Sequence, residues 1–594
     1  MTSSLLFLPG SRAKWCPRWS SVRQLSHSAQ ALATGSLKTE NSPSTHTTQP
    51  TFESLGLHPP IIAALRTAFP HVVEPTKTQA QFIPAILSGR DVLLKDVTGS
   101  GKSFGLVVAL LNKPRLRAEN KKENVTSLVL VPHRDLGHQL VYWIERMHSA
   151  ALEVGPNTTM PPLESIVQLL VRDGGAHLTS GLTMLKQVPP HILITTPQAA
   201  LDVYQNSPDA LQLNKLSSVV VDEVDYLITT IPRKDPERSF HGAVVKAQKK
   251  VMRHPGATRE LLDIIYAQRI RARSDTKDER GLASGLEVEM RKRRAGLAGR
   301  GPVKGPQLIV SSATLRKHLA NYLYEDSGYL NPDGVLKVKG EGVTAKEVGS
   351  QEKTVVGLGG KNVTHHVLVV SEDGIRNTEG AIEAEQRSQE GGKKLTADIL
   401  AGETSANDIP QVEDWMIQGE FTFDREVGIR GLNELTAYQD KASPFDPNAL
   451  EAIATAFALD VASIALLVLP ASAGVQRAVY ELREMGVNAE ALDGRTAFDT
   501  SREEGRLVVC TEATIRGMDL PAVETVFVLG ILEGGGMTGR SVDGYVHVAG
   551  RVGRLGGGSG KVISVVDGPD GERTIGQILK TRLGVNPVKL GYFD

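Results

Sequence analysis

Several features are scarce in this chain of 594 residues, and each scarcity excludes a class of protein. The two cysteines, Cys16 and Cys510, are too few for a disulfide scaffold or a cysteine-rich zinc site. No apolar run reaches about 18 residues, so we expect no membrane-spanning helix. The 67 Lys and Arg residues balance 67 Asp and Glu residues, so any nucleic-acid binding must come from local basic surfaces. Because 40% of the residues are hydrophobic, the chain is not disordered as a whole, and its length favours about two to four domains.

Acidic residues are absent from the first 39 residues, which contain five basic residues and many Ser and Thr. Their longest apolar stretch, residues 5–8, is too short for a secretory signal. This composition predicts a mitochondrial transit peptide over residues 1–25, cleaved after Leu25, with a flexible extension over 26–50. The expected location is therefore the mitochondrial matrix, and the alternative is a disordered cytosolic or nuclear tail.

Short runs of Val, Leu and Ile alternate with helical stretches in two blocks. In the first block the runs are 91–95, 128–132, 192–196, 219–222 and 307–311, and in the second they are 365–370, 466–469, 507–510, 526–529 and 561–566. Continuous apolar runs followed by loops and helices are typical of buried parallel strands in βα units. The sequence therefore predicts an α/β fold with domains over 51–330 and 363–594, joined by a Gly/Lys/Glu-rich linker over 331–362.

Two stretches of opposite charge interrupt this alternation, and both are longer than ordinary connections. Residues 231–306 contain 19 basic and 9 acidic residues, and residues 371–455 contain 18 acidic and 7 basic residues. The basic insertion is expected to be helical over 259–273 and 286–294, and is either an RNA-anchoring arm or a solvated loop. The acidic insertion is expected to be flexible or partly ordered, and either autoinhibitory or protein-binding.

The strongest chemical motif is a glycine-rich loop placed between the apolar run 91–95 and the apolar helix expected over 104–111. Its residues are Thr98, Gly99, Ser100, Gly101, Lys102 and Ser103. The glycines let backbone N–H groups close around a phosphate, and a helix N-terminus adds its positive end. Lys102 is expected to reach the β and γ phosphates, and Ser103 to hold Mg²⁺. Asp96 stands where the general pattern has its first glycine, and the alternative is a chance glycine-rich turn.

Two further motifs supply carboxylates and guanidinium groups. The apolar run 219–222 ends in Asp222 and Glu223, which suit Mg²⁺ coordination and polarisation of an attacking water. Arg551 and Arg554, three residues apart in the second block, can stabilise phosphate charge in a transition state across an inter-domain cleft. A solvated arginine pair is the alternative for that segment alone.

Taken in order, these motifs resemble those of the DEAD-box ATP-dependent RNA helicases of superfamily 2. The resemblance implies two tandem RecA-like domains, an RNA-dependent ATPase activity, ATP and Mg²⁺ as ligands, and RNA as partner. It implies that Gln79 reads the adenine, that Phe52 stacks on the base, and that Asp519 lies near the ribose and γ phosphate. Ser312 and Thr314 match the motif that couples hydrolysis to domain movement. The RNA-facing matches are Pro132, Arg134, Gly175, Thr196 and Thr511.

The chain departs from the family pattern mostly on the RNA side. His133 and Asp135 stand where the family usually has Thr and Glu, and Val548 replaces a usual Arg. The segment 494–506 is also shorter than usual. ATP turnover is therefore better supported than efficient duplex unwinding.

The transit-like start, the form of residues 131–136 and the pair His365-His366 are similar to the fungal mitochondrial DEAD-box helicases that act in large-ribosomal-subunit assembly. That similarity implies a helicase that remodels mitochondrial rRNA or ribosome assembly intermediates. The alternative is a weakly catalytic RNA-binding assembly scaffold that ATP only clamps. We expect the two histidines to be structural, and Cys510 to belong to a core.

Overall fold

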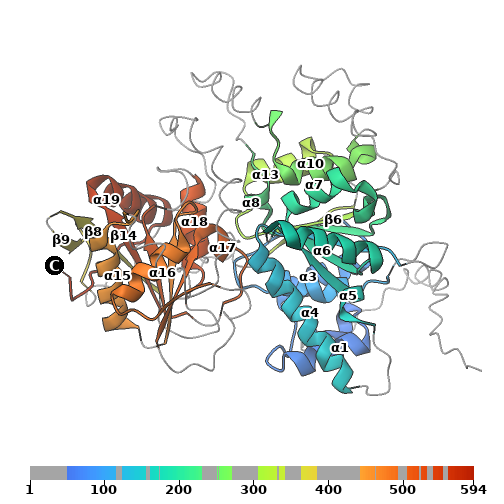
Figure 1. Cartoon of the computed structure of the whole chain (residues 1–594), viewed down its shortest axis with the longest axis horizontal. Coiled ribbons are helices and arrows are strands. Elements are labelled where there is room, and N and C mark those ends of the chain that lie inside the picture. Colours follow the sequence, from blue (N-terminus) through green and yellow to red (C-terminus); the bar gives the residue numbers. More distant parts are fainter. Residues whose placement is uncertain are drawn as a thin grey trace, which may run out of the picture. The chain divides into compact units, whose positions relative to one another are not determined.

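The computed structural model describes two seven-stranded sheets with helices against their faces (Figure 1). We call the first sheet and its helices the first lobe, and the second sheet and its helices the second lobe. The described residues are 50–115, 123–154, 161–172, 174–230, 251, 253–270, 305–330, 334–340, 363–372, 374–383, 442–461, 463–492, 505–520, 523–531, 539–552 and 560–593. The expected transit peptide lies outside them.

Every pair of neighbouring strands in the first sheet is parallel. In sheet order the strands are β3 (Val167–Leu170), β4 (Ile192–Thr195), β2 (Ser127–Leu130), β5 (Ser218–Val221), β6 (Gln307–Ser312), β1 (Val92–Lys95) and β7 (Leu336–Lys339). Because the strands are parallel, their carboxyl ends share one edge of the sheet, and the loops that follow them meet there.

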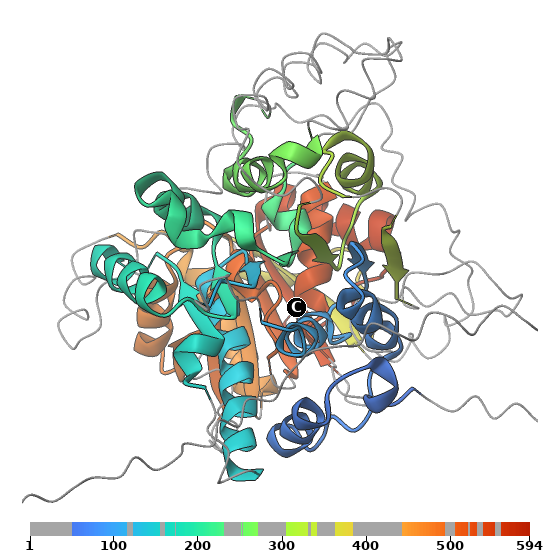
Figure 2. The same ribbon diagram turned by 90° about the vertical axis from the view of Figure 1, so that its right-hand side faces the viewer.

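The strands of the first lobe bury side chains on both faces, as their apolar sequences require. In β5, Val219 and Val221 belong to one hydrophobic core, whereas Val220 belongs to another on the opposite face. The core of Val220 includes α1 (Pro59–Ala68), α2 (Lys77–Leu87), α3 (Lys102–Leu111) and α4 (Arg134–Val154). The other core includes α6 (Gly174–Gln187), α7 (Pro197–Asn206), α8 (Val224–Leu227), α10 (Ala257–Ile265) and α13 (Lys317–Asn321). In Figure 2, α1 to α3 (blue) and α10 (light green) lie on different sides of the lobe.

The second sheet is parallel except at one edge, where β9 runs antiparallel to β8. Its order is β11 (Ala489–Ala491), β12 (Arg506–Thr511), β10 (Ile464–Leu469), β13 (Thr525–Leu529), β14 (Gly560–Asp567), β8 (Val363–Ser371) and β9 (Gly374–Asn377). Its described helices are α15 (Pro447–Asp460), α16 (Val475–Glu484), α17 (Glu512–Ile515), α18 (Gly539–Ala549) and α19 (Gly568–Gly576). The predicted α/β class, with two parallel sheets flanked by helices, is confirmed.

The expected linker over 331–362 contains a strand of the first sheet. β7 pairs in parallel with β1, so the linker prediction was wrong for these residues. Val338 is buried, whereas Lys337 and Lys339 are exposed. A short edge strand with exposed lysines protects the edge of a sheet from pairing with other strands. The same lysines made the segment resemble a linker in the sequence.

Part of the basic insertion is a component of the core. The buried side chains of Leu261, Leu262 and Tyr266, in and just after α10, pack in the hydrophobic core of the first lobe. Neither the RNA-anchoring arm nor the solvated loop describes this part, because its apolar residues recur at helical spacing and face the sheet. The second expected helix, 286–294, lies outside the described residues.

Both ends of the acidic insertion are folded into the second lobe. Its first residues form β9, in which Arg376 makes an ion pair of 2.6 Å with Glu572, and its last residues begin α15. Residues 384–441 lie outside the described part of the chain, so the predicted flexibility of the insertion stays a prediction.

The remaining residues singled out in the second block are structural. His365 Nδ1 lies 2.8 Å from the Tyr545 hydroxyl, and His366 Nδ1 lies 2.7 Å from the Val588 carbonyl oxygen. Both histidines are buried, and burial raises the pKa of the Cys510 thiol. These placements agree with the structural and core roles expected from the sequence. Among the described helices, none is long and apolar enough to cross a membrane.

The packing of α10 yields a direct stability test. Leu262 is fully buried, so Leu262→Ala should lower the free energy of unfolding by about 2–5 kcal/mol through lost burial and a residual cavity. The matched control is Leu152→Ala in α4, whose side chain is 44% exposed and whose loss should change stability by less than about 0.5 kcal/mol. Denaturant titration of both variants measures the difference. Equal effects would show that α10 does not contribute to the core.

Candidate active site

The predicted motifs of the first lobe fall into two groups, according to the position in the sheet of the strands that they follow. The loops that follow β1, β5 and β6 carry the glycine-rich loop, the Asp222-Glu223 pair and the Ser312–Thr314 motif, and these three strands are neighbours. The loops that follow β3, β4 and β2 carry the residues assigned to RNA, and these strands are also neighbours. One half of the strand-end edge thus holds the nucleotide residues, and the other half holds the RNA residues.

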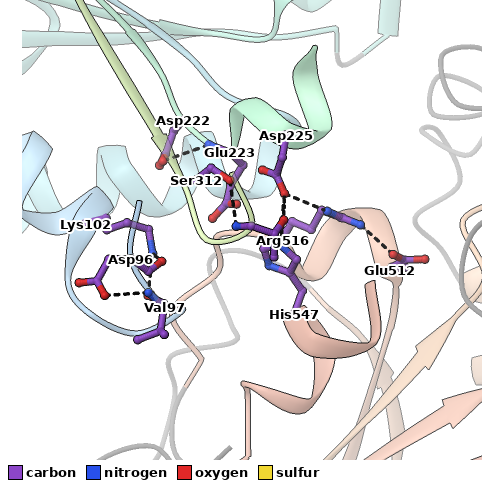
Figure 3. A network of polar contacts seen from close by, with 11 residues as sticks. Asp96, Val97, Lys102, Asp222, Glu223, Asp225, Ser312, Glu512, Arg516 and His547 are labelled. Carbon is purple, nitrogen blue, oxygen red and sulfur yellow. Dashed lines mark hydrogen bonds and ion pairs between the residues drawn. The ribbon is translucent and has the colours of Figure 1, made fainter. Parts of the chain in front are cut away.

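The glycine-rich loop joins β1 to α3 as a phosphate-binding loop does. Gly99 and Gly101 have φ angles of 80° and 77°, in the left-handed region that glycine tolerates. Gly101 caps α3, so the helix begins at Lys102. The Lys102 ammonium donates hydrogen bonds of 2.9 Å and 2.7 Å to the carbonyl oxygens of Asp96 and Val97 (Figure 3). The lysine therefore lies folded against its own loop, at the N-terminus of a helix where an anion is favoured.

Two hydroxyl groups hold the carboxylate of Asp222. Ser103 Oγ donates a hydrogen bond of 2.6 Å to Asp222 Oδ2, and Ser311 Oγ donates to Asp222 Oδ1. A hydroxyl and a carboxylate side by side offer the hard oxygen ligands that Mg²⁺ prefers. Ser103 and Asp222 therefore fit the metal role expected from the sequence. Sequence reasoning missed Ser311, which lies one residue before the recognised motif.

Gln79 is fixed between the start of α2 and the phosphate-binding loop. Its side-chain oxygen accepts a hydrogen bond of 2.9 Å from the Thr76 amide, and its side-chain nitrogen donates one of 2.9 Å to the Gly101 carbonyl. Thr76 and Gln79 form the capping box that starts α2. Phe52, by contrast, is 1% exposed and packs in the core, so its ring has no free face for a base in this structure.

Glu223 is a buried carboxyl group in a strained backbone position. Its φ angle of 52° lies in the left-handed region, which is rare for a residue with a side chain. Burial, together with the charges of Asp225 and Asp222, raises the pKa of Glu223 to about 7, against the opposing charges of Lys102 and Arg551. A carboxyl group that changes protonation near neutral pH suits proton transfer to and from water.

A buried polar network joins the two lobes beside Glu223 (Figure 3). Asp225 accepts a hydrogen bond from the Thr314 hydroxyl, and His547 Nε2 lies 3.4 Å from both the Asp225 carboxylate and the Thr314 hydroxyl. Burial by itself raises the pKa of Asp225, but the hydrogen bond from His547 and the charge of Arg516 lower it below its usual range. Burial lowers the pKa of His547 to about 4, so it is neutral at physiological pH and donates through Nε2.

Arg516 and Arg551, both from the second lobe, extend this network. Arg516 donates to Glu512 at 2.8 Å, lies 3.9 Å from Asp225 and stacks over the ring of Tyr226 with its guanidinium carbon 5.1 Å from the centroid. Arg551 is 2% exposed and donates to the Met518 carbonyl. Arg554 lies outside the described residues.

A polar cavity lies where these residues meet. It is lined from the first lobe by Thr98, Gly99, Gly101, Lys102, Ser103, Phe104, Trp143 and Glu223, and from the second by Gly517, Met518, Asp519 and Arg551. The cavity thus brings together predicted nucleotide residues from both sheets. Ser312 does not line it; its hydroxyl accepts a hydrogen bond of 3.0 Å from the Thr314 amide, and the serine shapes the turn that presents Thr314.

The residues assigned to RNA lie at the other half of the edge. Pro132 follows β2, Thr196 caps α7 after β4, and Gly175 lies in the first turn of α6 after β3. Arg134, at the start of α4, has a side chain that is 37% exposed. In the second lobe the Thr511 hydroxyl accepts a hydrogen bond of 3.3 Å from the Thr514 amide and so caps α17.

His133, which stands in place of a usual Thr, contacts the second lobe. Its Nε2 donates a hydrogen bond of 2.8 Å to the Arg516 carbonyl oxygen, and its Nδ1 accepts one of 3.2 Å from the Leu136 amide. Burial lowers the pKa of His133 to about 4, which keeps it in this neutral form. Six residues further on, the Gln139 side chain accepts a hydrogen bond of 2.7 Å from the Asp519 amide.

Sequence reasoning assigned no role to several residues that the structure places at the site. Asp225, Arg516 and His547 lie inside recognised motifs, and each is a charged or polar residue next to an apolar strand or helix. That pattern could have predicted that their side chains are buried and paired with other polar groups. The local sequence around His133 and Gln139 gives no such signal, because their contacts are made with the second lobe.

A phosphate-binding loop, an acidic strand end and a second sheet that contributes an arginine define a two-lobed nucleotide-binding protein of the α/β class. Residues 76–251 match the family model described as DEAD/DEAH box helicase. This stretch of the chain is therefore similar to the DEAD/DEAH box helicases.

Curated relatives match about a third of the chain. The human protein named "Probable ATP-dependent RNA helicase DDX28" is 32% identical over 185 residues, which are 30% of this chain and 31% of that protein. The Arabidopsis thaliana DEAD-box ATP-dependent RNA helicase 31 is 31% identical over 207 residues, which are 34% of this chain and 27% of that protein. The chain thus spans about a third of the length of the curated relatives it matches. Among solved structures, S. cerevisiae Dbp5 bound to RNA and ADP BeF3 covers 91% of this chain and 95% of its own, with 14% identity and a TM-score of 0.49.

The raised pKa of Glu223 predicts how stability depends on pH. The pKa of Glu223 is about 7 in the folded protein and ordinarily 4.5. Between these two pH values the folded state keeps Glu223 protonated, whereas the unfolded state has released the proton. The free energy of unfolding therefore falls as pH rises through this range. Glu223→Gln removes this penalty, so its stability relative to wild type should rise by on the order of 2 kcal/mol from about pH 5 to pH 8. Denaturant midpoints across that range measure it.

The control for this series is Glu145→Gln, an exposed position in α4. It reports the effect of a Glu-to-Gln change away from the site. A difference between Glu223→Gln and wild type that does not change with pH would mean that Glu223 titrates as an ordinary carboxyl group.

Proposed function

We propose that the protein is an ATP-dependent RNA helicase, an RNA-dependent ATPase that remodels RNA or ribonucleoprotein. The observation that carries this proposal is the polar cavity, whose lining includes the phosphate-binding loop and Glu223 from the first lobe and Asp519 and Arg551 from the second. A site completed by two lobes can couple nucleotide turnover to their relative movement. Because the curated relatives match only in part, the activity of the whole chain rests on this geometry and on the motifs.

The nucleotide residues predicted from the sequence have distinct roles in the proposed reaction. Thr98, Gly99, Ser100, Gly101 and Lys102 bind the ATP phosphates, Gln79 binds the base, and Asp519 binds the ribose. Ser103 and Asp222 hold Mg²⁺, which when bound neutralises charge on the phosphates. Glu223 orients the attacking water and accepts its proton. Arg551 and Arg554 stabilise the charge that develops on the transferred phosphoryl group.

The buried network supplies the coupling. Thr314 and Asp225 belong to the first lobe, and His547 and Arg516 to the second, so lobe separation breaks their contacts. Loss of the γ phosphate would change the charge beside Glu223, which lies next to Asp225 in the acidic turn. Ser312 acts on the network by shaping the turn of Thr314.

RNA binds across the other half of the strand-end edge. Pro132, Arg134, Gly175, Thr196 and Thr511 contact phosphate and 2′-hydroxyl groups, which carry little sequence information. When the lobes close, they bend one strand of a bound RNA duplex, and the complementary RNA strand is released. RNA affinity should accordingly weaken as salt rises.

We further propose that the protein acts in the mitochondrial matrix, on mitochondrial rRNA and large-subunit assembly intermediates. The acid-free, arginine-containing first 25 residues support the location. The proposed domains are the transit peptide (1–25), an N-terminal extension (26–50), and RecA-like domains over 51–330 and 363–594, with the first sheet continued by β7.

A second candidate function is an RNA-binding assembly scaffold that ATP clamps shut. The cross-lobe contact of His133 favours it, because motif residues that otherwise face RNA here bind the second lobe. Such a contact stabilises closure whether or not ATP is hydrolysed.

ATP hydrolysis by residues 26–594, measured with and without RNA, tests the main proposal. Wild type should show RNA-stimulated phosphate release. Lys102→Ala should lose phosphate binding, and Glu223→Gln should lower kcat by roughly 10²- to 10⁴-fold because it cannot accept a proton. Retained RNA binding without hydrolysis above these variants would favour the scaffold.

Attachment of residues 1–25 to a fluorescent protein tests the location. The fusion should enter mitochondria and be shortened, whereas a version with its four basic residues (Arg12, Lys14, Arg18 and Arg23) changed to Gln should stay outside. Fluorescence microscopy and the size of the product report both outcomes. A diffuse wild-type fusion would remove the support for the matrix.

A further inference from the structure

A buried acidic side chain, Asp96, opens the phosphate-binding loop. It is 3% exposed and precedes the residues that bind phosphate. Its Oδ1 accepts a hydrogen bond of 2.8 Å from the Val97 amide, and its Oδ2 accepts one of 2.6 Å from the Thr78 hydroxyl. Both oxygens are thus engaged as acceptors, which suits a carboxylate.

Gly340 lies directly against the Asp96 carboxylate. A Cβ atom on Gly340 would overlap the carboxylate, whose two oxygens and carbon are the three nearest atoms to that position. The Gly340 amide donates a hydrogen bond of 2.9 Å to the Lys95 carbonyl, which holds the end of β7 against the start of the loop. The absence of a side chain at 340 therefore leaves the space that Asp96 occupies.

The backbone of Asp96 forms hydrogen bonds with other residues of the site. The Asp96 carbonyl accepts the hydrogen bond from Lys102, and the Asp96 amide donates one of 3.3 Å to the Ser312 carbonyl. Thr78, which binds the carboxylate, precedes Gln79 on α2. One residue thereby links the helix of Gln79, the end of β7 and the strand that precedes Thr314.

We propose that Asp96 is a positioning residue that docks the phosphate-binding loop between α2 and Gly340, and thereby sets the affinity of the site for ATP. The inference rests on the proposed function, because it takes the ligand to be a nucleotide. A docked loop has its backbone amides in place before the phosphates arrive, and a loosened loop must be ordered on binding. Affinity therefore falls when the docking is lost.

Two other accounts of Asp96 make different predictions. If its negative charge mainly repelled the phosphates, removal of the charge would tighten nucleotide binding. If it only stabilised the fold, its removal would lower the melting temperature and leave nucleotide affinity unchanged.

The experiment is an equilibrium titration of the full chain with a fluorescent ADP analogue and Mg²⁺, paired with melting curves. Asp96→Ala removes both hydrogen bonds and should weaken binding roughly tenfold. Asp96→Asn retains an acceptor for the Val97 amide and a partner for the Thr78 hydroxyl, so it should stay within about twofold of wild type. Gly340→Ala lies outside every recognised motif and should reproduce the loss seen in Asp96→Ala. Gly576→Ala, a helical position with nothing within 4 Å of the added atom, is the control and should bind as wild type does.

The double variant Asp96→Ala/Gly340→Ala decides whether Gly340 acts through Asp96. Once the carboxylate is gone, the added methyl group has room, so the double variant should bind like Asp96→Ala alone. Additive losses, unchanged binding in Gly340→Ala, or tighter binding in Asp96→Ala would each overturn the proposal. Absence of binding by wild type would instead reject the proposed function, and the variants would have nothing to report.

Discussion

The parallel alignment of strands in the first sheet is the constraint on which the site depends. Because β1, β5 and β6 end at one edge, residues more than two hundred positions apart in the chain meet without long loops. The hydrogen bonds that Ser103 and Ser311 donate to Asp222 are a direct result, since these residues follow or end three neighbouring strands. The same alignment separates the residues predicted to bind nucleotide from those predicted to bind RNA.

Buried charge explains the special properties of the acidic turn. Asp222, Glu223 and Asp225 lie within four residues, and all are largely removed from water. Hydroxyl groups hold Asp222 through hydrogen bonds, while His547 and Arg516 contact Asp225 and lower its pKa. Glu223 lies between them, and burial with two acidic neighbours raises its pKa instead. One short segment therefore presents a candidate metal ligand, a group that titrates near neutral pH and a contact to the other lobe.

Contacts between the lobes run through both halves of the site. Asp225 and Thr314 meet His547 near the cavity, while His133 and Gln139 meet the backbone around Arg516 and Asp519. The segment that follows β12 is thus held from the nucleotide side and from the RNA side. A movement of that segment would therefore change contacts in both halves of the site.

The sequence by itself determined the class of the fold and most of the nucleotide site. Apolar runs that end in glycine, aspartate or serine mark parallel strands and their loops, because such runs must be buried on both faces and the chemistry must then follow their carboxyl ends. Only the tertiary structure decided how the remaining residues act. It placed β7 in the sheet although its lysines resemble a linker, buried Phe52, folded part of the basic insertion into the core and turned His133 toward the second lobe. These outcomes depend on which surface lies opposite a residue, and local sequence does not contain that information.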